Sequence, residues 1–364
     1  MNTRTEADSI GTLEVPVDAY YGVQSLRGKL NFPITGHPMH DKLIVSLAQI
    51  KKASAIANKH AGTLDAKIAD AIIQASDEVI EGKLHDQFIV DAIQGGAGTS
   101  ANMNANEVIA NRAIEILGGQ KGDYSIVHPN DHVNMAQSTN DVYPTAGKLT
   151  ILALLPAALH QLNRLYEALE IKAQEFDDVV KMGRTQLQDA VPIRLGQEFH
   201  AYASAIQRDI KRLHKAAKDM CVVNMGATAI GTAINVSADY LDHIVADLRE
   251  ITKFPLIQSE NLIDGTQNLD GFVNVSGIIK TCAVNLSKMS NDLRLMSSGP
   301  RTGLAEINLP PKQNGSSIMP GKVNPVIPEV MSQVAFNIIG NDMCITMAAE
   351  AGQLELDAFE PVVF

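Results

Sequence analysis

The segment Ile278–Ser298, IIKTCAVNLSKMSNDLRLMSS, decides the fold class. It contains neither proline nor glycine, and leucine, methionine, alanine and lysine, which favour helix, make up much of it. Its apolar residues recur at helical spacing and form one stripe that starts just before the segment. The members of this stripe are Val275, Ile278, Ile279, Cys282, Leu286, Met289, Leu293 and Met296.

Three further segments have the same character, and all run well past the mean helix length of about 11–12 residues. They are Ala157–Met182, Gln197–Met225, and a stretch from Glu329 onward that is broken only at Gly340 and Gly352. Long helices with apolar faces need partners of equal length, so a mainly α bundle is predicted. The stripes are broad enough to predict burial on more than one side, and therefore helices shared between the subunits of a homo-oligomer.

The N-terminal part has shorter helical segments and predicts a smaller helical domain. A change of composition near Val127–Asp141 marks the boundary. We therefore expect an N-terminal domain at residues 1–139 and a long-helix bundle domain at residues 140–364. The helices expected in the first domain are Leu43–Lys59, Asp65–Glu81 and Asn102–Leu117.

Composition limits the possible functions. The 364 residues are 45% hydrophobic and 20% charged, with a formal net charge of −11, 4% aromatic residues and no tryptophan. Without a basic run or stacking rings, nucleic-acid binding is not expected. No apolar run reaches about 18 residues, so no membrane span is expected. Three widely spaced cysteines and scattered histidines predict no disulfide framework, no metal site and a cytoplasmic location.

One irregular segment, Gly299–Pro325, is expected to interrupt the long helices, and loops of this length are usually functional or disordered. It ends in Gly315–Pro325, GSSIMPGKVNP. Glycines allow this loop to move, Lys322 suits an anion, and Ser316 or Ser317 could donate to that anion or act as a base. On composition alone an ordinary connection is the more common reading of such a stretch. A phosphate-binding loop fails, since five residues separate its glycines and valine follows the lysine.

Three other polar segments border the predicted helices. Residues 95–102 (GGAGTSAN) place Thr99 and Ser100 at a helix start, where free N–H groups attract anions. Residues 138–141 (STND) and 183–192 (GRTQLQDAVP) offer hydroxyl and amide groups. Each segment could be a helix cap or a turn. Together with a nearby cation from Lys322, Arg184 or Arg301, they suit a small polyanion and suggest neither a metal nor a cofactor.

In this order the segments GGAGTSANMNANE (95–107), QSTNDVYPT (137–145), GRTQLQDAVP (183–192) and GSSIMPGKVNP (315–325) resemble the aspartase/fumarase superfamily. The resemblance starts at DAYYGVQSLRG (18–28) and covers essentially the whole chain. Within the superfamily the chain is most similar to the aspartase branch, on the segments GATAIGT (226–232), SGPRTGLAEINLP (298–310) and NPVIPEV (324–330).

The resemblance implies a reversible anti elimination of ammonia from L-aspartate that gives fumarate, without a cofactor, in a homotetramer whose sites each use three chains. By motif position, Ser316 resembles the general base. Lys322 and Asn324 resemble ligands of the α-carboxylate. The residues that resemble the hydrogen-bond cage of the β-carboxylate are Thr99, Ser138, Thr139 and Ser317, and those placed like residues around the amino group are Asn140, Thr185 and Gln186.

Three other readings stay open. Fumarate hydratases generally have a histidine at the position of Gln186, paired with a glutamate at that of Glu329, and glutamine cannot transfer a proton, so this residue favours an ammonia-lyase. A lyase acting on a related amino dicarboxylate is a further enzymatic alternative. Members of the family continue beyond the position of Phe364, so their C-terminal domain is expected to be absent, and an inactive, truncated helical oligomer is the third reading.

Overall fold

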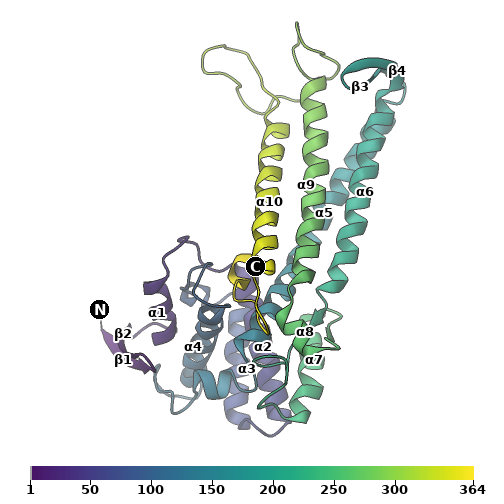
Figure 1. Ribbon diagram of the computed structural model, residues 1–364. Coiled ribbons are helices and arrows are strands. Elements are labelled where there is room, and N and C mark those ends of the chain that lie inside the picture. The colour runs from purple at the N-terminus through teal and green to yellow at the C-terminus, as the bar shows by residue number, and fades with distance from the viewer. Residues whose placement is uncertain (1) are drawn as a thin grey trace. The chain divides into compact units, whose positions relative to one another are not determined.

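The protein is described by a computed structural model covering residues 2–364, and it is mainly helical, as predicted (Figure 1). The chain divides into two compact units, each discontinuous in sequence. Unit 1 contains residues up to Leu154 together with 218–272 and 347–364, and unit 2 contains 155–217 and 273–346. Helices α5 (Thr139–Glu175) and α9 (Asp270–Met296) contribute to both units, so the units do not follow a single cut in the sequence. The predicted division at residue 140 stays a prediction.

Unit 1 is built from short helices, as expected for the N-terminal part. Helix α2 packs against both α3 and α7, and α3 packs against α4. Leu47, Ile50, Ile72, Ile109 and Tyr240 are completely buried in this unit. The elements are β1 (Thr3–Asp8), β2 (Gly11–Pro16), α1 (Val23–Asn31), α2 (Asp41–His60), α3 (Ala66–Ile80), η1 (His85–Gln87), α4 (Thr99–Ile116), η2 (Pro129–Val133), β5 (Val222–Val223), α7 (Ala238–Thr252), β6 (Ile257–Gln258), α8 (Leu262–Gln267) and α11 (Glu360–Val363).

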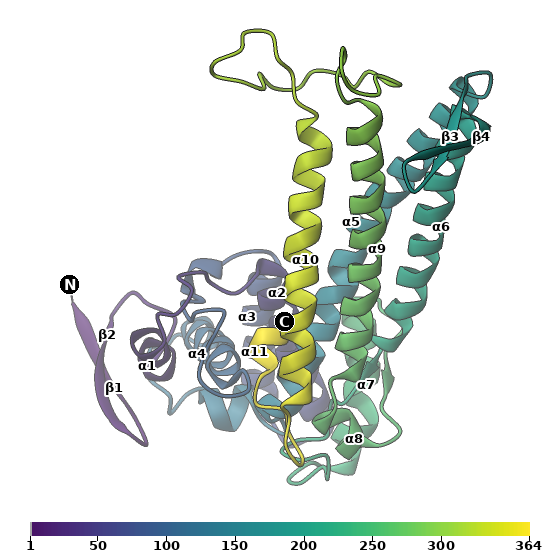
Figure 2. The same cartoon turned by 45° about the horizontal axis from the view of Figure 1, so that its top comes forward.

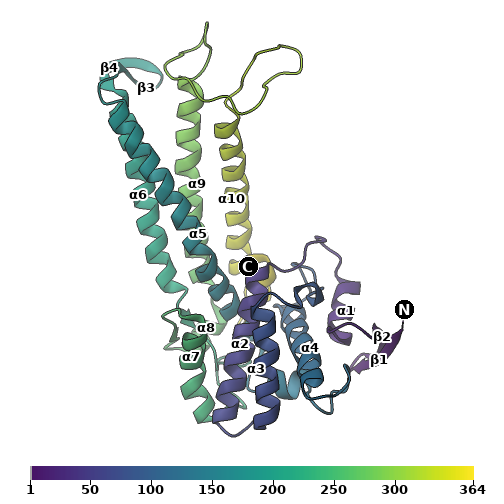
Figure 3. The ribbon, with the colours of Figure 1, turned by 180° about the vertical axis from the view of Figure 1, so that it is seen from behind.

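Unit 2 consists of long helices that run alongside one another (Figures 1 and 3). Its elements are most of α5 (Thr139–Glu175), β3 (Val180–Thr185), β4 (Gln188–Arg194), α6 (Leu195–Asp219), α9 (Asp270–Met296) and α10 (Val326–Glu350). All four long segments singled out in the sequence are therefore mainly helical. The helix predicted up to Met225 ends earlier, because α6 stops at Asp219 and β5 follows at Val222–Val223. From the predicted stripe on α9, Met289 and Met296 lie in a core with Leu159, Phe199 and Ile206. Ile279 of that stripe is exposed instead.

The irregular segment between α9 and α10 contains no helix or strand, as predicted. The segment leaves the bundle at the same end as the β3–β4 hairpin. Figure 2 shows this end tilted toward the viewer. The hairpin was not predicted as strands. Helix α5 ends at Glu175, whereas the helix was predicted to run to Met182. Strand β3 begins at Val180, within the part that was predicted as helix.

Helix α1 is held in place by a buried carboxylate of α4. Its N-cap residue, Gly22, has no side chain to satisfy the first N–H groups. Glu107 replaces the cap and accepts from the N–H groups of Gly22 (2.8 Å), Gln24 (2.8 Å) and Ser25 (3.0 Å). Burial nevertheless raises the pKa of Glu107 above its usual value. This arrangement fixes Gln24 beside the cavity described below.

Among residues 2–364, only α5 is long and apolar enough to cross a membrane. Half of its most apolar window is buried within the protein, and the core helix of a soluble protein meets the same criteria.

Candidate active site

Helix α4 begins at Thr99, where the sequence placed a helix start. The preceding residue, Gly98, has φ = 84° and a side chain there would collide with the ring of Tyr143, at 2.2 Å from the nearest ring atom. Only glycine fits this position. The side chain of Gln94 accepts from the N–H of Ala101 at 2.7 Å and so caps one donor of the first turn. The positive end of α4 therefore lies at Thr99, which lines the cavity described below.

Helix α5 begins in the second polar segment. The backbone N–H of Ser138 donates to Asp141 at 2.9 Å, and the Ser138 hydroxyl accepts from the N–H of Asn140 at 3.2 Å. The amide of Asn140 donates to the carbonyl of Ala229 at 2.7 Å. Asn140 therefore ties α5 to a later segment and is not among the residues that line the cavity.

A cavity of about 630 Å³ lies in unit 1 and brings together Thr99, Ser138 and Thr139 from two predicted polar segments. Its surface is formed chiefly by hydroxyl and amide groups, and among the described residues no lysine or arginine lines it. Such a surface supplies many hydrogen bonds but no positive charge. The other lining residues are Gln24, Asn102, Met103, Asn130, Asp131, Asn134, Met135, Ala136, Gln137, Thr228, Ala229, Ile234 and Asn235.

One wall of this cavity comes from the segment 226–232, which the sequence identified as characteristic of the aspartase branch without a role. The carboxylate of Asp141, completely buried, accepts from the N–H groups of Gly226 (3.1 Å) and Thr228 (3.0 Å). Burial raises the pKa of Asp141 to about 6. The hydroxyl oxygen of Thr228 is buried and has no hydrogen-bond partner among the described residues. It is the one cavity-lining hydroxyl that is both buried and unpartnered.

A completely buried ammonium group lies under the cavity. Lys51 of α2 donates to the side-chain oxygens of Asn102 (2.7 Å), Asn134 (2.9 Å) and Gln137 (2.9 Å). Burial lowers the pKa of Lys51 to about 7, and the negative charge of Asp141 opposes this shift. Sequence reasoning did not single out Lys51. Its helical spacing from buried Leu47, four positions earlier, was the signal that could have identified it.

The third polar segment forms the β3–β4 hairpin of unit 2. Its last strand pair is Thr185 with Gln188, so Gln186 and Leu187 form a two-residue turn. Both have positive φ, 52° and 64°, as in a type I′ turn that normally prefers glycine or asparagine. Gln186 is thus held at the tip in a conformation that costs free energy, which is common at functional sites.

The hairpin is anchored to the long irregular segment. Arg184 forms an ion pair of 2.6 Å with Glu306, and Lys181 forms one of 3.0 Å with the same carboxylate. Burial alone would raise the pKa of Glu306, but these two cations lower it. Arg184 is therefore engaged by a carboxylate and is a poor candidate for binding a substrate anion.

The signature loop, residues 315–325, closes on itself. The N–H of Gly315 donates to the carbonyl of Lys322 (2.8 Å), and the amide of Asn324 donates to the carbonyl of Gly315 (2.9 Å). The hydroxyl of Ser316 accepts from the N–H groups of Ile318 (3.2 Å) and Met319 (2.9 Å). Two backbone donors aimed at one oxygen favour negative charge on it.

Lys322 and Ser317 lie exposed in this loop. Lys322 forms no salt bridge with any residue in the range 2–364, so its charge is available to a ligand. Of the predicted site residues, Thr99, Ser138 and Thr139 thus share the unit 1 cavity and Asn140 lies at the same helix start. Those in unit 2 are Thr185 and Gln186 on the hairpin and Ser316, Ser317, Lys322 and Asn324 in the loop.

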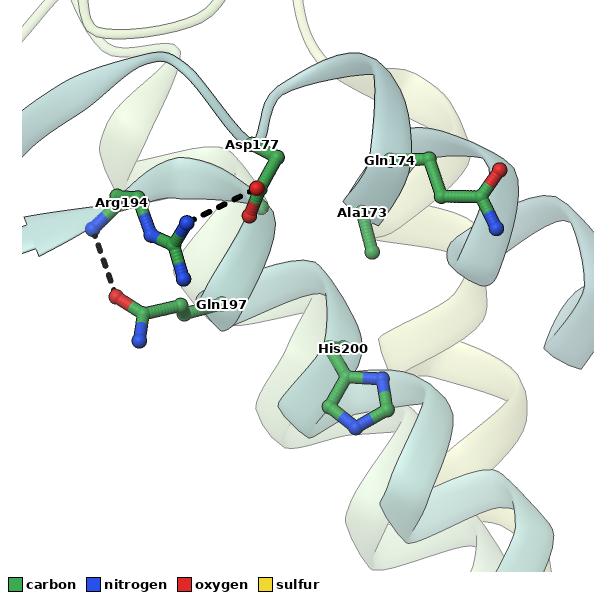
Figure 4. A pocket seen from close by; sticks show the side chains of 7 residues that line it. Ala173, Gln174, Asp177, Arg194, Gln197 and His200 are labelled. Atoms are coloured by element: carbon green, nitrogen blue, oxygen red, sulfur yellow. Dashed lines mark hydrogen bonds and ion pairs between the residues drawn. The ribbon is translucent and has the colours of Figure 1, made fainter.

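A second hollow lies at the end of α5 and the start of α6 (Figure 4). Its arginine, Arg194, is already paired with Asp177 at 2.9 Å, and its histidine, His200, is paired with Glu170 at 2.9 Å. No cation remains there for a dicarboxylate. In the part of the chain from residue 2 onward, no group of three or more His, Cys, Asp or Glu side chains could hold a metal ion.

Comparison with known proteins gave consistent relatives. The model of the Lyase family matches residues 11–340. Aspartate ammonia-lyase of Bacillus subtilis (strain 168) is 56% identical over 99% of this chain and 76% of its own length. The enzyme of the same name from Escherichia coli (strain K12) is 52% identical over 100% of this chain and 76% of its own.

Solved structures with the same fold are also available. A fumarate lyase:delta crystallin from Brucella melitensis, bound to cobalt, superposes with a TM-score of 0.98 at 52% identity and covers 100% of this chain and 79% of its own. A class II fumarase from Schistosoma mansoni gives a TM-score of 0.95 at 38% identity, with coverage of 100% and 79%.

Proposed function

The chain belongs to the Lyase family of these relatives, and we propose that it catalyses the reversible anti elimination of ammonia from L-aspartate with Ser316 as the base. Identities of 52–56% to aspartate ammonia-lyases over nearly the whole chain make it a carbon–nitrogen lyase of this type, acting on a small dicarboxylate. The observation that carries the proposed mechanism is the Ser316 hydroxyl, which accepts two backbone N–H bonds in a loop with an unpaired lysine.

In the proposed reaction, Ser316 removes a proton from Cβ of aspartate. The electron pair of that C–H bond first enters the neighbouring β-carboxylate and gives an enediolate with two negative charges. It then forms the Cα–Cβ double bond while the Cα–N bond breaks, and ammonia leaves with the electron pair of that bond. The products are fumarate and ammonia, and no oxidant or cofactor is needed.

The difficult intermediate is the enediolate, because the Cβ proton lies next to a carboxylate. Preorganised donors that bind the dianion better than the ground state lower this barrier. We assign that role to Thr99, Ser138, Thr139 and Ser317. Lys322 and Asn324 would hold the α-carboxylate, while Asn140, Thr185 and Gln186 would surround the amino group. Asn140 contributes through its remaining amide oxygen, since its nitrogen bonds Ala229.

The proposal is tested by supplying the protein with L-aspartate and, separately, with L-malate, and following fumarate by its ultraviolet absorbance. We expect fumarate and an equal amount of ammonium from aspartate, and no fumarate from malate. Gln186 supports this expectation, since an amide cannot act as the general acid or base that transfers a proton of water. Fumarate from malate alone would identify a hydratase, and none from either substrate would support an inactive helical oligomer.

We also propose that a complete site needs several subunits of a homotetramer. The unit 1 cavity has donors but no cation, while the base and Lys322 belong to unit 2. Helix α10 supports this, because apolar side chains are exposed along it on more than one side. These are Ile327, Val330, Val334, Phe336 and Met343. The proposed location is the cytoplasm, where thiols such as that of buried Cys282 stay reduced.

Light scattering on the intact protein is expected to give four times the 39.1 kDa of one chain. Co-expression of Thr139→Val and Ser316→Ala chains should then restore part of the activity that each variant lacks alone, because mixed tetramers contain some sites with both groups intact. A monomeric mass would contradict the shared bundle. A tetramer in which co-expression restores no activity would contradict sites that use residues from different chains.

A further inference from the structure

The buried ammonium of Lys51 has no role in the mechanism just described. It lies under the cavity of unit 1, and its three hydrogen bonds all go to side-chain amides. Burying a cation is costly unless its donors are satisfied. All three amides, those of Asn102, Asn134 and Gln137, line the cavity. The buried charge is therefore connected directly to the candidate site.

Lysine fixes the orientation of these amides. Below its pKa of about 7, Lys51 is an ammonium group with three donors and no acceptor, so each neighbouring amide must turn its oxygen toward it. The nitrogen of Asn102 then points away from Lys51 and donates to the hydroxyl oxygen of Thr139 at 3.1 Å and to the side-chain oxygen of Asn134 at 3.2 Å. An isolated asparagine at this position could adopt either orientation, but one beside Lys51 cannot.

The orientation of Asn102 determines what Thr139 can offer to a ligand. A hydroxyl has a single proton, and the Thr139 oxygen already accepts from Asn102. Its proton bonds no acceptor among residues 2–364, so it is free to point into the cavity. If Asn102 were reversed, its oxygen would attract that proton, and Thr139 would present only lone pairs to a carboxylate.

We propose that Lys51 is a positioning residue, which holds Asn102 so that the hydroxyl of Thr139 donates to the substrate carboxylate and its developing dianion. This inference rests on the proposed function. Lys51 acts through Asn102 and does not touch the substrate, since it is completely buried and does not line the cavity.

A double-mutant cycle separates this role from simple support of the fold. Thr139→Val, which removes the donor, is expected to lower kcat/KM for L-aspartate by about 10²-fold. Lys51→Met should lower it by about 10–10²-fold, because Asn102 can then reverse. The double variant should fall no more than about threefold below Thr139→Val, since Lys51 has nothing left to position. Multiplied losses in a folded double variant would overturn the proposal.

Lys52→Met provides the matched control. Lys52 is the next residue of α2 and pairs at 2.6 Å with Asp77, away from the cavity. We expect its kcat/KM to stay within about twofold of the wild type, because an outward-facing ion pair contributes little. A loss as large as that of Lys51→Met would show that any lysine change in α2 disturbs the site, and would overturn the specific role.

Removal of a buried lysine can prevent folding, so a second variant tests the same relay. Asn102→Asp keeps an acceptor for Lys51, which also retains those on Asn134 and Gln137, but places a second oxygen instead of a donor beside the Thr139 hydroxyl. It should lose about as much activity as Lys51→Met, again with little further loss when combined with Thr139→Val. Unchanged kcat/KM or additive losses in this variant would contradict the relay. Wild-type activity on aspartate is measured first, so failure of the proposed function is distinguished from failure of this inference.

Discussion

Replacing Ser316 with alanine is expected to lower kcat for L-aspartate by about 10²–10⁴-fold, the usual contribution of a positioned general base. The hydroxyl of Ser316 accepts from two backbone N–H groups, of Ile318 and Met319. Donors aimed at this oxygen stabilise an alkoxide and lower the cost of forming the base. Closure of the loop would exclude water and strengthen the effect of these donors and of Lys322.

The measurement is the initial rate of fumarate formation by the variant, with circular dichroism to confirm unchanged helix content. Ser297→Ala is the matched control, since that serine lies at the end of α9 and its hydroxyl bonds only the preceding turn through Arg294. The control should keep the wild-type rate. A Ser316→Ala enzyme that also keeps it would remove Ser316 from the role of base.

The long helices were predictable because their apolar residues repeat over many turns, and their burial confirms the pattern. The start of α5 was missed for a physical reason. The predicted segment starts at Ala157, directly after Pro156, but α5 begins at Thr139 and runs through both Pro144 and Pro156. Pro144 cannot donate to the carbonyl of Asn140, and the side-chain amide of Asn224 donates to that carbonyl at 3.1 Å instead.

The strands were missed because their pairing depends on tertiary contacts. The β3–β4 hairpin has no Asn-Gly or Asp-Gly turn, and Gln186–Leu187 gives no local signal for positive φ. The candidate site shows the same limit. Motifs brought Thr99, Ser138 and Thr139 to attention, and they share one cavity. Lys51, by contrast, has no motif, and its neighbours come from two distant parts of the chain.

Asp141→Asn is expected to destabilise the protein by about 2–4 kcal/mol, the cost of one or two buried N–H groups without an acceptor. One carboxylate oxygen accepts from Ser138, and the other from Gly226 and Thr228. Asparagine has a single oxygen, so in either orientation its NH₂ group faces a backbone donor. A lower thermal midpoint is the expected result. Asp131→Asn, which changes an exposed carboxylate at the same cavity, should stay within about 0.5 kcal/mol.

Burial of the ionised carboxylate offsets part of this loss at pH 7, and the pH dependence of the loss measures that offset. Burial raises the pKa of Asp141 from 3.8 to about 6, so the folded protein binds this proton more tightly than the unfolded chain. Wild-type stability from this group therefore rises as pH falls from about 6 to about 4. Lys51 remains protonated in both states across that window, because its pKa of about 7 lies above it. Asparagine does not titrate, so the difference in thermal midpoint should widen from pH 7 to pH 5. A difference that narrows would mean that the Asp141 carboxylate is stabilised, rather than penalised, by its buried surroundings.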